Sequence, residues 1–243
     1  RPSNSLISLL RPWWPQTTAS AQVRLAVLDR MIGAHPEAAW EVLAHCIPGG
    51  SMWASANAKP HWRDDDAGAP KGNHFDEYYV AEVGERILAQ AHGHASRIAL
   101  LVSKIDSFDG EYRDRILALL RDAMEFSDGE RQLVRDALRH HLNWQLSFNR
   151  ENAQALAETQ SLRALYDELA PVDLPTRHGW LFDQDWVELP DGRDDDYQAV
   201  EAARVQSRTQ ALAEIFAAYG WPGVERLLAI ANPALVGWYL PTL

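Results

Sequence analysis

Residues 20–48 constrain the fold more than any other stretch of the sequence. In the first half of this stretch, apolar residues recur at intervals of three and four, which is typical of an amphipathic helix. Pro36 interrupts the pattern and is well suited to begin a second helix, because its fixed φ fits the first helical position. The second half carries another wide apolar face. Two such helices form a hairpin, and a hairpin needs further helices to bury both apolar faces.

The rest of the chain continues this helical pattern, and no strand-like alternation stands out. Further helices are predicted at residues 5–10, 75–92, 96–107, 150–169, 195–219 and 223–231. Two segments between them open alike, with Asp109-Gly110-Glu111 and Asp128-Gly129-Glu130, where each Asp can cap a helix. They form a weak internal repeat, which is typical of helical-repeat proteins.

We therefore predict an all-α fold, specifically an irregular α-solenoid-like stack of antiparallel helix pairs. Two long Trp/Pro-rich loops, residues 49–73 and 170–193, interrupt the stack. Residues 1–243 are expected to form one helical-repeat domain that is a fragment of a longer chain, with a sub-division into 1–107 and 108–243 as the alternative. In the longest predicted helix, Ala202, Val205, Thr209, Leu212, Phe216 and Tyr219 form the expected buried face.

The net charge and the cysteine content limit which binding partners and which cellular location we expect. A net charge of −11 argues against non-specific nucleic-acid binding, whose affinity comes from clustered Lys and Arg. The alternative is a helical array that binds nucleic acid through a local basic face, made of Arg113, Arg115, Arg121, Arg131, Arg135 and Arg139. The only cysteine, Cys46, is predicted to be a buried, inert thiol, and its isolation fits a reducing, cytoplasmic location. No apolar run approaches a membrane span, so we expect no membrane partner.

Metal chemistry is the first catalytic alternative. His61, Asp64 and His74 are weak metal candidates, because His and carboxylate side chains on a loop can hold an ion that activates water. Their spacing matches no established metal motif, so we favour a solvated acidic loop. An all-α metal-dependent or acid/base enzyme built around residues 61–76 remains the alternative function.

Other polar groups have structural interpretations. Asp194, Asp195 and Asp196 are interpreted as a helix N-terminal cap. His178 and Asp183 could form a general base and its orienting carboxylate, but their apolar neighbours favour a packing plug. The sequence has no Gly-rich phosphate loop, GxSxG elbow or HExxH motif. We therefore predict no catalytic residue and no cofactor.

Tryptophans are the predicted partner-binding residues. The set is Trp13, Trp14, Trp53, Trp62, Trp180 and Trp186. Aromatic anchors dominate protein interfaces, so these residues favour a protein partner or a neighbouring domain of the parent chain. Packing against the helices is the competing interpretation. Exposure separates the two, because an anchor needs an accessible indole ring.

Several stretches resemble one group of proteins. PWWPQTTAS, HPEAAWEVLAHCIPGG, KPHWRD and RHGWLFDQDWVELP, the last preceding a long Ala/Arg-rich helix, are similar to the C-terminal helical region of very large bacterial proteins. In those proteins a helical-repeat arm follows an effector or a STAND-type NTPase, often in anti-phage defence. The resemblance implies a sensor or scaffold arm that recognises a macromolecule, and it transfers no functional residue. The leading hypothesis is thus a non-enzymatic recognition or scaffolding module.

Overall fold

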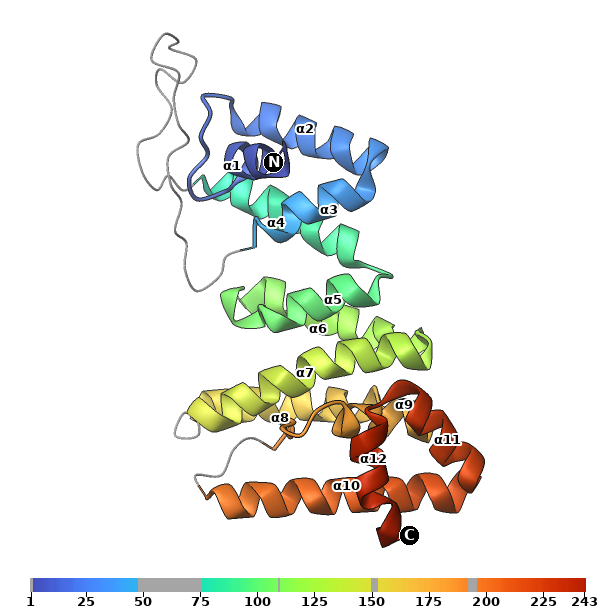
Figure 1. Ribbon diagram of the computed structural model, residues 1–243. Helices are drawn as coiled ribbons and strands as arrows, with labels where there is room; N and C mark the ends of the chain where they lie inside the picture. The colour runs from blue at the N-terminus through green and yellow to red at the C-terminus, as the bar shows by residue number, and fades with distance from the viewer. Residues whose placement is uncertain (1, 48–75, 109, 150–152, 192–195) are drawn as a thin grey trace. The chain divides into compact units, whose positions relative to one another are not determined.

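The computed structural model describes residues 2–47, 76–108, 110–149, 153–191 and 196–243 (Figure 1). Within these ranges every regular element is a helix and no residue forms a strand, which confirms the predicted all-α class. In the same ranges, no helix combines the length and the apolar composition needed to cross a bilayer. The chain divides into two compact units. Unit 1 comprises Arg1–Leu100 and Lys104–Leu117, and unit 2 comprises Leu101–Ser103 and Ala118–Leu243.

Unit 1 is built around the predicted hairpin. Its elements are α1 (Pro2–Leu10), α2 (Ala21–Ala34), α3 (Pro36–Ala44), α4 (Glu77–Ala91), most of α5 (Ala95–Ser103), η1 (Ile105–Ser107) and the start of α6 (Gly110–Asp122). The Ser20 hydroxyl accepts the first-turn amide of Val23 at 3.4 Å, and Pro36 is the first residue of α3, as predicted. The α4 helix packs against both α2 and α3, which supplies the cover that the hairpin needs.

The segment between α1 and α2 packs inward. The Tyr79 hydroxyl donates to the carbonyl of Leu10 at 2.7 Å, and the Cys46 thiol donates to the same oxygen at 3.6 Å. Burial raises the pKa of the Cys46 thiol to about 12, so the thiol is protonated at neutral pH, in agreement with the prediction of an inert cysteine.

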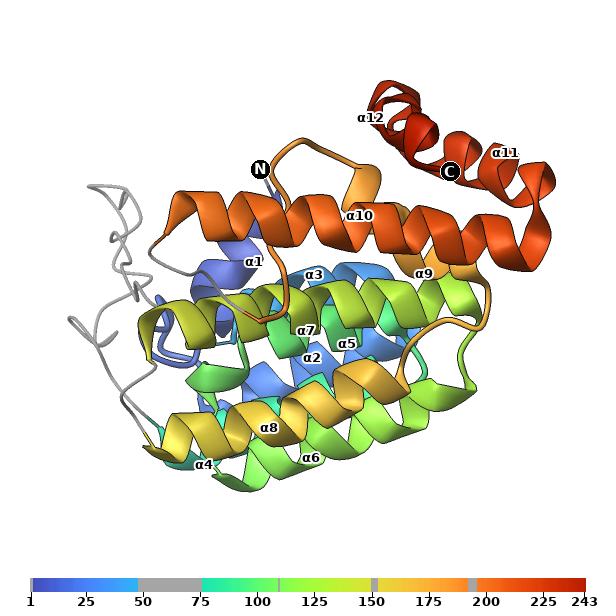
Figure 2. The ribbon, with the colours of Figure 1, turned by 90° about the horizontal axis from the view of Figure 1, so that it is seen from below.

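Unit 2 contains the long helices. After η2 (Ala123–Glu125) come α7 (Asp128–Phe148), α8 (Ala153–Glu168), α9 (Leu174–His178), η3 (Gly179–Phe182), α10 (Tyr197–Tyr219), α11 (Trp221–Ile230), α12 (Pro233–Tyr239) and η4 (Leu240–Thr242). The α7 and α8 helices pack side by side, as do α10 and α11 (Figure 2). The segment predicted as a loop at 170–193 instead contains the two short helices α9 and η3.

One predicted helix cap in unit 2 differs from the structure, and two are correct. The α7 helix is capped by Ser127, in a capping box with Glu130, and not by Asp128. Asp128 lies in the first turn, where its carboxylate accepts the backbone N–H of Asp173 at 2.7 Å. The predicted caps at the ends of α10 are correct where the structure describes them. Asp196 accepts from the amide of Gln198, and Gly220 ends the helix with φ of 62°.

The buried face of α10 differs from the predicted one. Ala202, Val205 and Tyr219 are exposed, and the face that packs inward consists of Arg204, Arg208, Ala211, Leu212 and Ile215. Hydropathy places arginine in solvent, but here α10 packs against the irregular segment between α8 and itself. That segment has backbone carbonyls that need donors, and arginine supplies them.

Candidate ligand pocket in unit 2

The chain between η3 and α10 is held by side chains that donate to its carbonyls. From α7, Arg139 donates to the carbonyl of Glu188 at 2.8 Å and Asn143 donates to that of Leu189 at 2.8 Å. From α10, the two buried arginines act in the same way: Arg204 bonds the carbonyl of Val187, and Arg208 bonds those of Leu181, Gln184 and Asp185. The bonds fix an irregular backbone that no sheet or helix ladder supports.

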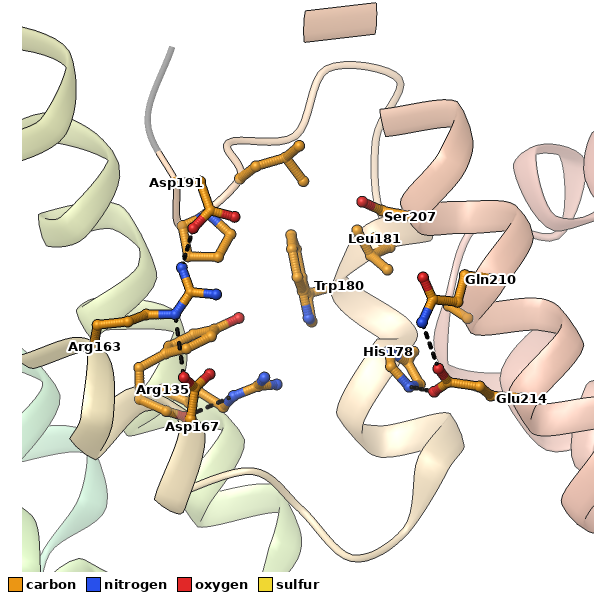
Figure 3. Close-up of a pocket in the computed structure, with 14 residues that line it drawn as sticks. Arg135, Arg163, Asp167, His178, Trp180, Leu181, Asp191, Ser207, Gln210 and Glu214 are labelled. Atoms are coloured by element: carbon orange, nitrogen blue, oxygen red, sulfur yellow. Dashed lines mark hydrogen bonds and ion pairs between the residues drawn. The ribbon is translucent and has the colours of Figure 1, made fainter. Parts of the chain in front are cut away.

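This fixed segment forms one wall of a pocket of about 240 Å³ (Figure 3). The other walls come from α7, α8, α9, η3 and α10. The lining residues are Arg135, Arg163, Tyr166, Asp167, His178, Trp180, Leu181, Leu189, Pro190, Asp191, Ser207, Gln210, Ala211 and Glu214. An apolar cavity of about 150 Å³ is large enough to admit benzene, so this pocket has room for a small metabolite.

Arg135 is a buried cation in the wall of this pocket. Its side chain is 8% exposed, and its guanidinium donates to the carbonyls of Tyr166 at 3.1 Å and Arg177 at 3.2 Å. No carboxylate among the described residues forms an ion pair with Arg135, although the guanidinium lies 4.1 Å over the Tyr166 ring. Burial lowers the pKa of Arg135 because the charged form is desolvated. Among the described residues, the site therefore holds a buried positive charge in no ion pair, although the carboxylates of Asp136 and Asp167 offset part of this charge.

The indole of Trp180 supplies an unsatisfied donor. Trp180 is 9% exposed, and its Nε1–H has no hydrogen-bond acceptor among the described residues. The indole nitrogen points into the space between Arg135 and His178 (Figure 3). Buried N–H groups usually have a partner, since leaving one unpaired costs about 1–3 kcal/mol. An acceptor that enters the pocket would remove this cost.

The opposite side of the pocket carries a histidine–carboxylate pair. His178 Nε2 lies 3.0 Å from Glu214 Oε2, and Gln210 donates to the other carboxylate oxygen at 2.9 Å. Burial lowers the pKa of His178, although the Glu214 carboxylate opposes this effect. In neutral His178, Nε2 carries the proton because the carboxylate can only accept, which leaves Nδ1 as an acceptor.

The rim of the pocket is an ion-pair cluster. Arg163 donates to Asp167 at 3.3 Å and also pairs with Asp191. Both carboxylates are largely exposed, so the cluster is screened by solvent and its energetic value is small. Its carboxylates nevertheless place negative charge at the entrance.

A separate exposed aromatic pair lies at the start of α10. Trp186 is 40% exposed and stacks on Tyr197 with ring centroids 5.5 Å apart, while Arg204 lies 3.3 Å over the Trp186 ring. Residues seven apart on a helix are separated by about 10.5 Å along its axis, so the Trp186 ring fits between Tyr197 and Arg204. The outer part of this aromatic pair faces solvent.

The predicted partner-binding tryptophans occupy different environments. Trp13 and Trp180 are buried and do not meet the criterion of an accessible ring, whereas Trp14 is half-buried. Trp186 is exposed and meets it. Trp53 and Trp62, together with the metal candidates His61, Asp64 and His74, lie outside the described residues.

The structure also bears on the alternative sites. Among the described residues, no group of three or more His, Cys, Asp or Glu side chains is arranged to hold a metal ion. The predicted basic face is not a set of free cations, because many of its members are engaged within the protein. Arg135 and Arg139 are buried against carbonyls, Arg115 pairs with Glu85, and Arg131 pairs with Asp128.

Sequence reasoning considered His178 as a general base, as the less favoured alternative to a packing role. The base-and-carboxylate hypothesis used Asp183, five residues away, whereas the hydrogen-bond partner is Glu214 on α10. Arg163, Asp191 and Gln210 carried no local signal, because only the tertiary packing brings them to one pocket. In comparisons with protein-family models, curated proteins and solved structures, nothing matches this chain.

Proposed function

We propose that the chain is a non-enzymatic helical module that recognises a polypeptide partner, with its helix pairs arranged as an irregular, solenoid-like stack. The observation that carries the proposal is the exposed Trp186–Tyr197 pair. Large aromatic rings are the commonest energetic anchors of protein interfaces, and they cost little conformational entropy to order. A stacked pair held by Arg204 is already oriented before a partner arrives.

The surroundings of this pair favour a partner that carries Arg or Lys. Four exposed aspartates lie close to it in the sequence: Asp183, Asp185, Asp191 and Asp196. The whole chain has a net charge of −11, so a basic segment would be steered toward it. A cationic side chain also gains from contact with an aromatic face, by about 0.5–1 kcal/mol at an exposed site.

A second exposed aromatic pair extends the candidate surface. Trp144 and Phe148, on the last turns of α7, have ring centroids 6.0 Å apart. The end of α7 and the start of α10 lie at the same end of unit 2 (Figures 1 and 2). Exposed apolar side chains that gather in one region are typical of interaction sites. The role agrees with the sensor or scaffold arm that the sequence resemblance implies.

Selection from a random peptide library against the full chain tests the proposal. Enriched peptides should be rich in Arg or Lys, and Tyr197→Ser should weaken their binding about tenfold, which corresponds to the loss of one anchor. Trp238→Ser is the matched control, because Trp238 is also a large exposed aromatic side chain, 80% exposed, but lies on a different helix, α12. Peptides without basic residues, or equal effects of the two variants, would contradict the proposal.

A further inference from the structure

We infer that the pocket of unit 2 binds a small monocarboxylate, whose carboxylate group accepts hydrogen bonds from Arg135 and from the indole N–H of Trp180. The inference does not depend on the polypeptide partner proposed above, because the pocket and the Trp186–Tyr197 pair use different residues. It rests on the two buried donors, on the charge of the pocket and on its apolar walls.

The unsatisfied groups in the pocket are donors. The Trp180 N–H has no acceptor among the described residues, and within the same residues Arg135 donates from Nε and Nη1 but not from Nη2. The Arg135 guanidinium and the Trp180 nitrogen face the same space (Figure 3). Both side chains are more than nine-tenths buried, so water cannot satisfy them as freely as it would at the surface. A ligand group that satisfies these donors must therefore be a hydrogen-bond acceptor.

The acceptor is anionic, because Arg135 is a buried cation without an ion-pair partner among the described residues. A carboxylate matches the planar guanidinium and forms short, charge-assisted hydrogen bonds with it. In contrast, the Glu214 carboxylate of the pocket already accepts from His178 and Gln210.

The charge of the pocket favours a single negative charge over two. Asp167, Asp191 and Glu214 line the same pocket, and each repels an entering anion. A phosphate monoester carries about −1.5 to −2 at neutral pH and experiences this repulsion more strongly than a monocarboxylate.

The remaining walls of the pocket favour an apolar group attached to the carboxylate. Leu181, Leu189 and Ala211 contribute apolar surface beside the polar groups. A volume of about 240 Å³ accommodates a short branched or aromatic group attached to the carboxylate. Isobutyrate and benzoate are suitable probes, and isobutyramide and benzamide are neutral compounds of nearly the same shape.

Titration of the ¹⁵N-labelled full chain with these probes tests the inference. Isobutyrate or benzoate should shift one indole N–H resonance with saturation below about 10 mM, and that resonance should be absent from Trp180→Phe. The substitution retains an aromatic ring and removes the N–H, and it should weaken carboxylate binding about tenfold or more. Trp13→Phe is the matched control, because Trp13 is equally buried in unit 1 and its Nε1–H also has no acceptor among the described residues.

Several outcomes would overturn the inference. They are equal binding of the amides, tighter binding of inorganic phosphate, the absence of saturable binding by either carboxylate, and equal weakening by Trp13→Phe and Trp180→Phe. Comparison of the circular dichroism spectrum and the melting temperature of each variant with those of the unmodified chain identifies any loss caused by unfolding. A correctly folded Trp180→Phe protein that binds carboxylate with unchanged affinity also contradicts the assignment of the donor.

Discussion

The guanidinium of Arg204 lies 3.3 Å over the Trp186 ring, and its Nε atom donates to the carbonyl of the next residue, Val187, at 2.9 Å. One side chain therefore fixes both the orientation of an exposed aromatic ring and the course of an irregular backbone. Its other end pairs with Glu201, one turn earlier on α10. One turn later on α10, Arg208 also donates to the irregular backbone, with three carbonyls as acceptors. In unit 2, buried arginine side chains donate to backbone carbonyls that would otherwise need the hydrogen bonds of a helix or a sheet.

Arg208→Met should destabilise unit 2 by about 2–4 kcal/mol, although methionine is apolar and nearly fills the same volume. The substitution leaves the carbonyls of Leu181, Gln184 and Asp185 without their donor, and unsatisfied buried acceptors are costly. Urea denaturation followed by circular dichroism measures the change as a lower midpoint at constant slope.

The matched control for this substitution is Arg226→Met. Arg226 lies on α11 in the same unit, is 54% exposed, and forms one ion pair among the described residues, with Asp173. Its loss should change the free energy of unfolding by about 0–1 kcal/mol, as is typical of surface ion pairs. Similar midpoints for the two variants would show that Arg208 is not needed to satisfy the segment before α10.

The difference between these arginines explains how far the sequence could predict the fold. The hairpin of α2 and α3, and the ends of α10, follow from local rules: a hydroxyl cap at Ser20, a fixed φ at Pro36 and a left-handed glycine at Gly220. The inward face of α10 depends instead on what packs against it. A hydropathy pattern assigns Arg204 and Arg208 to solvent, because it does not register carbonyls contributed by a distant, irregular segment.

The candidate pocket was inaccessible to sequence reasoning for the same reason. His178 and Glu214 are 36 residues apart, and the donors Arg135 and Trp180 come from α7 and η3. No local spacing links these residues. The exposed ring of Trp186 was predicted as an anchor from its residue type alone, and only the structure separates it from the buried ring of Trp180.

Arg24→Met, unlike Arg208→Met, should not lower the free energy of unfolding substantially. Arg24 is buried in unit 1 with its guanidinium 3.7 Å over the Tyr79 ring, but its Nε and Nη1 atoms have no acceptor among the described residues. Methionine removes a desolvated charge and keeps apolar contact with the ring, so the free energy of unfolding should rise or change by less than about 1 kcal/mol. A loss as large as that of Arg208→Met in urea denaturation would contradict this account.

Gly223→Ala should destabilise the contact between α10 and α11 by about 1–3 kcal/mol. A Cβ atom at Gly223 would lie 2.6 Å from the Cβ of Tyr219 and 3.2 Å from the carbonyl oxygen of Ile215, neither of which can move without shifting α10. Gly237→Ala is the matched control on α12, where an added Cβ meets no atom within 4 Å. It should gain about 0.5–1 kcal/mol from helix propensity. Melting temperatures that move in the same direction for both variants would show that the close approach at Gly223 is unimportant.

The free energy of unfolding of the unmodified chain should fall more steeply with decreasing pH than that of the variant His178→Gln. Burial lowers the pKa of His178 below that of the unfolded chain, with Arg177 and Arg135 reinforcing the shift and Glu214 opposing it. The unfolded state therefore takes up the proton first as pH drops below about 6.5. The contribution of His178 is complete above this pH and is lost as pH falls through the folded pKa. His178→Gln removes the titrating group and retains a donor toward Glu214. From pH 7.5 to 5, the urea midpoint of the unmodified chain should converge toward that of the variant. A constant difference between the two midpoints would show that His178 does not titrate as its burial requires.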